Sequence, residues 1–249
     1  PLKSPEGRSA MSHKSLMLLT AAALTLMLTT TTTSAARHHA ALAMSAIYHM
    51  ALNQNGWVDD PEAARQKAIW FVRRAVRHAG TDPRTLALAA WALAYAGEDI
   101  DAAIALMDQS LHINPSFAEA WRWSGWLRLW AGFPDMAIDH LEKSLRLDPL
   151  DPARATSLPT GVAHFFARRL DQARTTLLRS FHEHPNWAPT SCFLASCYAH
   201  LGLLDEAKII IKRLRALPPV VRPNADLWRD SEQREFYLSG LQLAMSETE

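Results

Sequence analysis

The chain has 249 residues, a formal net charge of +1 at pH 7 and 49% apolar residues. This length fits one or two domains, and the apolar share is enough for a continuous core. Because the charge is close to zero and nothing resembles a nucleic-acid footprint, the composition argues against a protein that binds DNA or RNA.

Residues 1–35 are expected to be a disordered or signal-like segment. The sequence starts at Pro1 without a methionine, so we expect a fragment of a longer protein. An apolar run from Ser15 to Leu28 is followed by five threonines and by small residues at Ser34 and Ala36, which is the layout of a secretory signal peptide. The run is short for a membrane span. The alternative is a first helix of the array that follows. We expect a cytoplasmic protein, or an exported one if residues 11–36 are a signal.

Residues 36–83 are predicted to form a divergent first repeat, a pair of helices. Residues 36–54 are rich in Ala, Met and Leu, and an Asn-Gln-Asn-Gly run ends them. The second helix is predicted to begin with Asp60 as N-cap and Pro61 at its first position, and Gly80 is predicted to end it.

From residue 84 onward, three kinds of residue recur in one register. A proline ends each of four units at spacings of 34, 36 and 34, a small alanine recurs at the same spacings, and an aspartate lies two residues before each alanine. They are Pro115, Pro149, Pro185 and Pro219; Ala103, Ala137, Ala173 and Ala207; and Asp101, Asp135, Asp171 and Asp205. The predicted units are 84–115, 118–149, 154–185 and 188–219. Each aspartate should satisfy free N–H groups in the first turn of a helix.

Residues 118–149 show the pattern most completely. Their sequence is AEAWRWSGWLRLWAGFPDMAIDHLEKSLRLDP. The matching positions are Trp121, Ser124, Gly125, Gly132, Ala137, Leu141, Ser144 and Pro149. This segment resembles a tetratricopeptide repeat (TPR), a helix–turn–helix unit of 34 residues. The resemblance implies an all-α solenoid of antiparallel helix pairs in a right-handed superhelix. Two helices that cross closely need small residues at their contact, here Gly125 and Ala137.

The turn inside each unit should fall at a glycine. Gly97, Gly132 and Gly202 occupy this place, and Arg168 occupies it in the fourth unit. Pro159 should shorten or bend the first helix of that unit.

Residues 220–249 are predicted to be a connector and a C-terminal capping helix, which covers the open end of a repeat array. Asp230 and Gln233 are a plausible capping pair for this helix. Its apolar side would carry Phe236, Tyr237, Leu241 and Leu243.

The amino-acid sequence of residues 40–245 resembles that of a narrower group of proteins, the C-terminal TPR regions of bacterial class III adenylate/guanylate cyclases. The segments that carry this resemblance are GWVDDP, LALAAWALAYAGEDIDAAIAL, GVAHFFARRLDQAR and the tail WRDSEQREFYLSGL, together with residues 120–152. Related regions follow winged-helix DNA-binding domains in some transcription regulators. The resemblance implies an accessory module of a signalling protein, and a cyclase catalytic domain would lie outside this chain.

No catalytic or cofactor motif is present in the sequence. We find no Gly-rich phosphate loop and no H-E-x-x-H, so we predict a non-enzymatic protein with no cofactor. The histidines of His38-His39 and His182-Glu183-His184 lack further ligands at metal spacing, and we predict no metal site. Cys192 and Cys197 lie five residues apart on one predicted helix, which is unsuited to a disulfide within it, so we expect small reduced core residues.

The first helices of TPR units line a concave groove, and here they carry aromatic residues. The predicted peptide-groove residues are Trp91, Tyr95, Arg122, Trp126, Trp130, Phe165 and Phe166. The alternative is that these aromatics are ordinary core between helices. We predict a non-catalytic interaction scaffold that binds a polypeptide segment, from another protein or from another domain of the same polypeptide. The alternative function is a regulatory tail of a cyclase or a winged-helix regulator.

Overall fold

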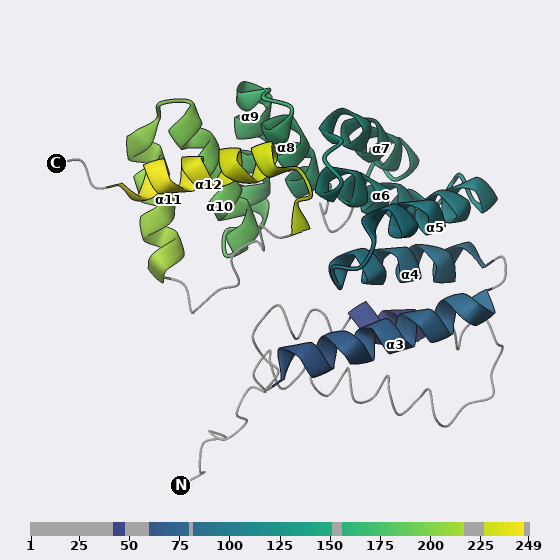
Figure 1. The fold of residues 1–249 in the computed structure, drawn as a ribbon. Helices are drawn as coiled ribbons and strands as arrows, with labels where there is room; N and C mark the ends of the chain where they lie inside the picture. Colours follow the sequence, from purple (N-terminus) through teal and green to yellow (C-terminus); the bar gives the residue numbers. More distant parts are fainter. Residues whose placement is uncertain (1–41, 48–59, 80–81, 151–155, 217–226, 247–249) are drawn as a thin grey trace, which may run out of the picture.

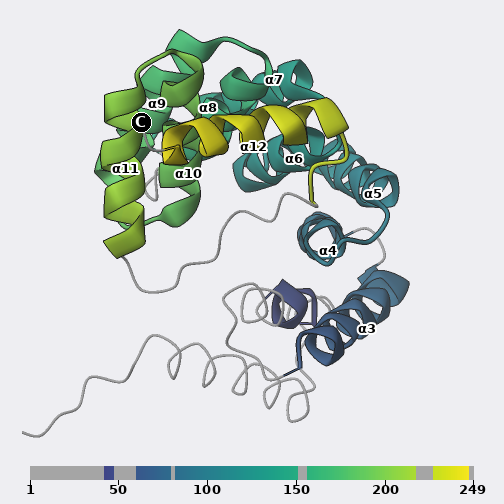
Figure 2. The ribbon, with the colours of Figure 1, turned by 60° about the vertical axis from the view of Figure 1, so that its left-hand side comes forward.

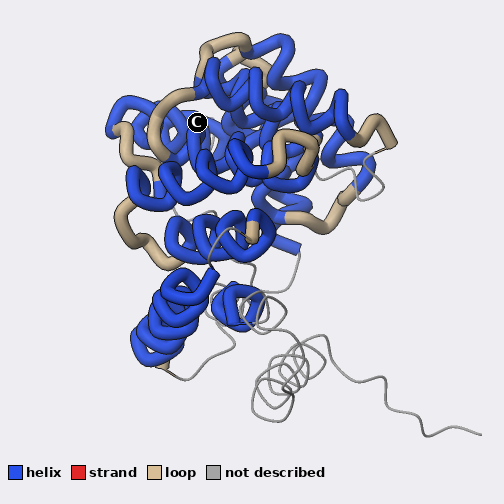
Figure 3. The backbone as a smooth tube through the Cα atoms, turned by 90° about the vertical axis from the view of Figure 1, so that its right-hand side faces the viewer, coloured by secondary structure: helices blue, strands red, loops and turns tan. Residues whose placement is uncertain are grey.

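In a computed structural model of the chain, residues 42–47, 60–79, 82–150, 156–216 and 227–246 are described. Every secondary-structure element within these ranges is helical, as Figure 3 shows. The signal-like segment predicted at residues 1–35 lies outside them. After a helical segment at residues 42–47, the helices are α3 (Pro61–Ala79), α4 (Pro83–Tyr95), α5 (Ile100–Ile113), α6 (Ala118–Trp130), α7 (Pro134–Leu147), α8 (Ser157–Phe166), α9 (Leu170–Glu183), α10 (Ala188–His200), α11 (Leu204–Ala216) and α12 (Ser231–Met245).

Helices α4 to α11 pack as successive antiparallel pairs, α4 with α5, α6 with α7, α8 with α9 and α10 with α11. The pairs lie side by side in chain order and form the curved array of Figures 1 and 2. The prediction of an all-α array of antiparallel helix pairs is confirmed for the described residues. We call the side lined by α4, α6, α8 and α10 the first-helix face, which is the concave side of such an array.

The turn inside each pair requires one residue with left-handed backbone. Gly97, Gly132 and Gly202 have φ of 71°, 93° and 77°, and Arg168 has φ of 61°. At each turn the next N–H reaches back to a carbonyl in the last turn of the first helix, for example from Phe133 to Arg128 at 2.8 Å. This hydrogen bond satisfies a carbonyl that the helix end would leave free, and glycine adopts the conformation without a steric penalty.

The contact between α6 and α7 depends on the absence of a side chain at Gly125. A Cβ atom there would lie 2.7 Å from Cγ of Leu141 and 3.4 Å from the carbonyl oxygen of Ala137. The same arrangement recurs between α8 and α9, where a Cβ on Gly161 would lie 2.7 Å from Cγ of Leu177. The close approach predicted for Gly125 and Ala137 is therefore present, and Leu141 fills the space beside it.

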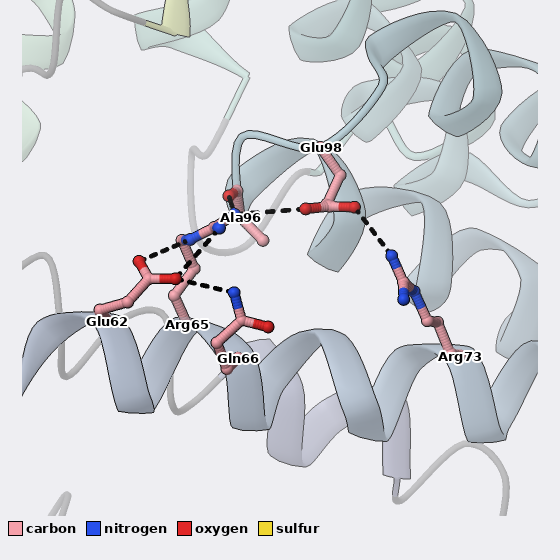
Figure 4. Close-up of polar contacts among 6 residues, drawn as sticks. All are labelled: Glu62, Arg65, Gln66, Arg73, Ala96 and Glu98. Carbon is pink, nitrogen blue, oxygen red and sulfur yellow. Dashed lines mark hydrogen bonds and ion pairs between the residues drawn. The ribbon is translucent and has the colours of Figure 1, made fainter.

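Helix α3 is attached to the turn after α4 by polar contacts, which Figure 4 shows. Arg65 donates to the carbonyl of Ala96 at 3.2 Å and pairs with Glu98 at 3.2 Å, and Arg73 pairs with Glu98 at 3.4 Å. Arg65 also pairs with Glu62 at 3.0 Å and lowers the pKa of that carboxyl. Beneath these contacts, α3, residues 42–47 and one side of α4 share a core of their own.

The starts of the second helices differ from the prediction. Asp135 and Asp171 lie in the first turns of α7 and α9, but the N-cap residues Phe133 and Arg169 make no side-chain cap hydrogen bond. Asp135 instead pairs with Arg169 of the next unit at 2.6 Å. The repeated aspartate thus joins neighbouring units at this position, because an arginine lies within reach.

The fourth unit has a short first helix. Helix α8 has 10 residues, against 13 in α4, α6 and α10. It begins at Ser157, so Pro159 lies in its first turn, where a proline removes no hydrogen bond from the helix. The predicted shortening is confirmed.

The predicted C-terminal helix is present as α12, and its N-cap is Asp230, whose carboxylate accepts from the N–H groups of Glu232 and Gln233. The side chain of Gln233 does not complete the expected capping box, because it donates to the carbonyl of Gly132 at 3.3 Å. Helix α12, yellow in Figures 1 and 2, packs mainly on α10 and runs across the array towards α8 and α6.

Candidate binding surface

Aromatic residues of α4 and α6 form one group on the first-helix face. Its members, called here the tryptophan cluster, are Trp91, Tyr95, Trp123, Trp126 and Trp130. The ring of Trp91 stacks on that of Trp130 with centroids 5.0 Å apart, on Tyr95 at 5.5 Å and on Trp123 at 6.2 Å. Trp126 lies 5.9 Å from Trp130.

The helix period brings these rings together. Trp91 and Tyr95 lie four residues apart on α4, and Trp126 and Trp130 lie four apart on α6, so each pair shares one side of its helix. Because α4 and α6 are neighbouring first helices, the two sides meet. Trp130 is 5% exposed, whereas the other four are only partly buried. Burial raises the pKa of Tyr95.

Arg122 lies apart from this stacking. Its guanidinium pairs with Glu119, three residues earlier on α6, at 3.3 Å. Its side chain is 21% exposed. The arginine predicted to be the polar residue of the groove is therefore already matched by a carboxylate of its own helix.

A second aromatic group lies further along the same face and includes residues of the C-terminal segment. We call it the phenylalanine cluster: Phe165 and Phe166 of α8, Phe193 of α10, and Trp228, Phe236 and Tyr237. The ring of Trp228 lies 4.7 Å from Phe166 and 5.7 Å from Phe193, and Phe236 lies 4.8 Å from Phe165.

Phe165 and Phe166, predicted to line the groove, are covered by this segment. They are 0% and 5% exposed. The sequence pattern predicts these two phenylalanines as groove residues but does not predict that Trp228 and Phe236 pack on them. The signal for this cover is the apolar side of the last helix, which the sequence pattern assigns to the open end of the array.

Hydrogen bonds to its main chain hold the C-terminal segment on the face. The N–H of Arg229 donates to the carbonyl of Trp130 at 2.8 Å, and Ser196 Oγ donates to the carbonyl of Tyr237 at 3.0 Å. Nε2 of His200 lies 2.7 Å from the carbonyl oxygen of Phe236, and the two rings stack with centroids 3.7 Å apart.

A polar network lies inside the array, between α5, α6 and α7. Arg128, 5% exposed, donates to Ser124 Oγ and to Asp108 Oδ1, both at 2.6 Å. Nδ1 of His140 lies 3.1 Å from the same Ser124 oxygen. Ser124 is fully buried, so this serine–histidine contact offers no access to a substrate. We assign it a structural role in joining three helices.

The described part of the chain contains no group of three or more His, Cys, Asp or Glu side chains that could hold a metal ion. Cys192 and Cys197 are buried and form no disulfide with each other. Burial raises the pKa of the Cys197 thiol to about 12, so it is a poor nucleophile. None of the described helices combines the length and the apolar character that crossing a membrane requires.

Comparison with solved structures identifies the class of fold. The chain is similar to TTC0263, a thermophilic TPR protein of Thermus thermophilus, with 19% identity and a TM-score of 0.55 over 72% of this chain and 92% of that chain. It is similar to a tetratricopeptide repeat protein of Parabacteroides merdae, with 14% identity and a TM-score of 0.56 over 92% and 93%. A third similar structure is PilW, a type IV pilus biogenesis factor, with 20% identity and a TM-score of 0.58 over 82% and 87%.

The chain therefore has the fold of a TPR solenoid. No protein-family model and no curated protein matches it. At these sequence identities, the similarity to solved structures supports the assignment of the fold and gives no information about binding partners.

Proposed function

We propose that the protein is a non-catalytic interaction scaffold, and that it binds a polypeptide segment on the first-helix face through the tryptophan cluster. Trp91, Tyr95 and Trp126 are the apolar contacts, Trp130 supports them from below, and Arg122 is the polar residue at the margin. The partner is another protein or another domain of the same polypeptide.

The observation that carries this proposal is that the same face already holds a polypeptide. Residues 227–245 lie against α8 and α10, with Trp228 and Phe236 on Phe165 and Phe166. The neighbouring tryptophan cluster has the same aromatic character. Among the described residues its rings stack on one another, and the segment reaches it at the main chain, where the N–H of Arg229 donates to the carbonyl of Trp130. Partly exposed aromatic rings on rigid helices are typical anchors of protein interfaces.

Display selection of peptides on the immobilised protein tests the proposal. The affinity of selected peptides should be measured by calorimetry for the wild type and for Trp126→Ala. We expect the variant to bind about 30-fold more weakly, which corresponds to a loss of about 2 kcal/mol for a typical anchor.

The matched control is Trp187→Ala. Trp187 is 55% exposed and lies before α10, so its removal should leave the affinity unchanged. Circular dichroism must show that both variants are folded. Equal affinities of the wild type and Trp126→Ala would contradict the proposal and place the binding site elsewhere.

A second candidate function is the regulatory tail of a multidomain cyclase or winged-helix regulator. It is supported by the resemblance of the sequence, and the tail WRDSEQREFYLSGL that contributes to this resemblance is the part that packs on α8 and α10. Sequencing the reading frame upstream of Pro1 tests it, because a cyclase or winged-helix domain should be found there.

We further propose a cytoplasmic location, which is consistent with two buried cysteines that form no disulfide with each other. Mass spectrometry of the protein from its native host should show an N-terminus upstream of Ser34. A mature N-terminus near Arg37 would establish export instead.

A further inference from the structure

The last segment does not continue the stack of helix pairs. A further first helix would pack mainly on the second helix of the unit before it, as α6 packs on α5 more than on α4, whereas α12 packs mainly on the first helix α10. Residues 227–233 instead reach the second and third units: Arg229 pairs with Asp101 of α5 at 2.8 Å, and Gln233 donates to the carbonyl of Gly132. The segment therefore lies along the first-helix face and crosses several units.

The surface on which the segment packs is formed by helix pairs that do not include the segment. Helices α8 and α10 pack on their own partners α9 and α11, and Gly161 and Leu177 close the first of these contacts. Phe165, Phe166 and Phe193 contact one another, with ring centroids 5.4 to 5.8 Å apart. The segment adds a layer to a surface that the pairs already define.

Two buried polar atoms of the segment make no hydrogen bond where it packs on the first-helix face. Nε1 of Trp228 and Oε1 of Gln233 are buried, and among the described residues neither finds a hydrogen-bond partner. A buried polar atom without a partner lowers the stability of the contact that contains it. The ion pair of Arg229 with Asp101 is solvent-exposed and is therefore weak.

We propose that residues 227–245 are an internal ligand, which closes the α8–α10 part of the first-helix face to external polypeptides until it is displaced. This inference rests on the proposed function, because a closed site has a consequence only if external polypeptides bind. The ligand class follows from the contacts. It is an aromatic anchor followed by an arginine for Asp101 and by a capped helix whose apolar side faces Phe165 and Phe193.

A synthetic peptide of residues 227–246 with a fluorescent label is the probe, and its binding to full-length proteins is measured by anisotropy. The double variant Trp228→Ala/Phe236→Ala removes both anchors from the internal copy and leaves the receiving face intact. We expect it to bind the peptide at least tenfold more tightly than the wild type, because the internal copy no longer competes. Hydrogen exchange should show faster exchange in α12 and unchanged protection of α8 and α10.

A second variant guards against a folding defect of the first. A methyl group at Gly240 would collide with Ser196 Oγ and lie 2.7 Å from Nε2 of His200, so Gly240→Ala should release α12 with both anchors retained. It should also bind the peptide more tightly than the wild type. The matched control is Leu238→Ala, a change on the 42% exposed outer side of α12, which should behave as the wild type.

Two results would overturn the inference. One is release of α12 in either variant without tighter peptide binding. The other is loss of protection in α8 and α10 together with α12 in both variants, which would make the segment part of the core. Neither result bears on the proposed function, which is tested separately by the affinity of selected peptides for Trp126→Ala. Conversely, if selected peptides bind independently of Trp126, the competition between internal copy and probe can still be observed.

Discussion

At the scale of single residues, the array depends on places where two helices touch without room for a side chain. Gly125 is such a place, because Leu141 lies where a Cβ would be. Glycine is otherwise unfavourable inside a helix by about 1 kcal/mol relative to alanine, so its presence in α6 reflects packing rather than propensity.

We therefore predict that Gly125→Ala destabilises the protein by about 1–3 kcal/mol, since the overpacking outweighs the gain in helix propensity. Gly161→Ala should behave alike, because it meets Leu177 in the same way. Urea unfolding measures both. Adding Leu141→Ala to Gly125→Ala should cost less than the sum of the single changes, and strict additivity would contradict the contact.

A second residue-scale prediction concerns His140. Burial, followed by the charge of Arg128, lowers its pKa to about 4 from the usual 6.5. Between these values the unfolded chain binds a proton that the folded chain does not, so stability should fall as the pH is lowered from about 7 towards 4. Because the ring is only partly buried, we expect a loss of roughly 1 kcal/mol by pH 5.

Urea unfolding of the wild type and of His140→Gln at pH 7 and pH 5 isolates this contribution. The variant should lose less stability between the two pH values than the wild type. An equal loss in both proteins would assign the pH dependence to other groups, of which His164 is one, since burial lowers its pKa as well.

At the scale of the element, α12 shows how a local signal and a long-range contact combine. Asp230 caps the helix through the N–H groups of Glu232 and Gln233. Arg229 contacts Asp101, 128 residues upstream, and Gln233 contacts Gly132, 101 residues upstream. The N-cap thus fixes where the helix begins, at the point where the segment reaches the third unit.

Asp230→Ala should cost about 1 kcal/mol, the usual contribution of an N-cap, and the loss should be local. Hydrogen exchange is expected to speed up in α12 while α6 and α7 keep their protection. Asp230→Asn, which retains a capping oxygen, is the matched control and should exchange as the wild type does. Faster exchange in α6 as well would mean that α12 and the array open as one unit.

At the scale of the whole molecule, the described residues contain two cores. One runs from α4 to α12, and the other holds residues 42–47, α3 and one side of α4. In a repeat array each unit is stabilised by itself and by its neighbours, so a small core at one end opens first. The ion pairs of Arg65 and Arg73 with Glu98 are partly exposed and add little to this end.

We predict that amide hydrogens of α3 exchange faster than those of α6 and α7 under native conditions, because opening of α3 disrupts the smaller core alone. Hydrogen exchange with mass spectrometry measures this directly. Equal protection of α3 and α6 would show that the two cores unfold together.

The sequence by itself determined the repeat, because each helix pair is specified by contacts close in the chain. Gly125 with Ala137 and Leu141, the left-handed turn at Gly132 and the first-turn position of Pro159 all lie within one unit. The spacing of small, apolar and proline residues therefore predicts the helices, the turns and the pairing, and even the exceptional turn at Arg168.

The tertiary structure alone decided which aromatic residues remain open. Phe166 and Trp130 occupy equivalent places in successive units, as Gly161 and Gly125 do. The ring of Phe166 contacts Trp228, about sixty residues downstream, whereas the ring of Trp130 stacks on Trp91 of the unit before it. No repeat spacing records a contact between segments so far apart. Where the last helix packs depends on the summed burial of Trp228, Phe236 and Tyr237 against several units, and this sum exists only once the array has formed.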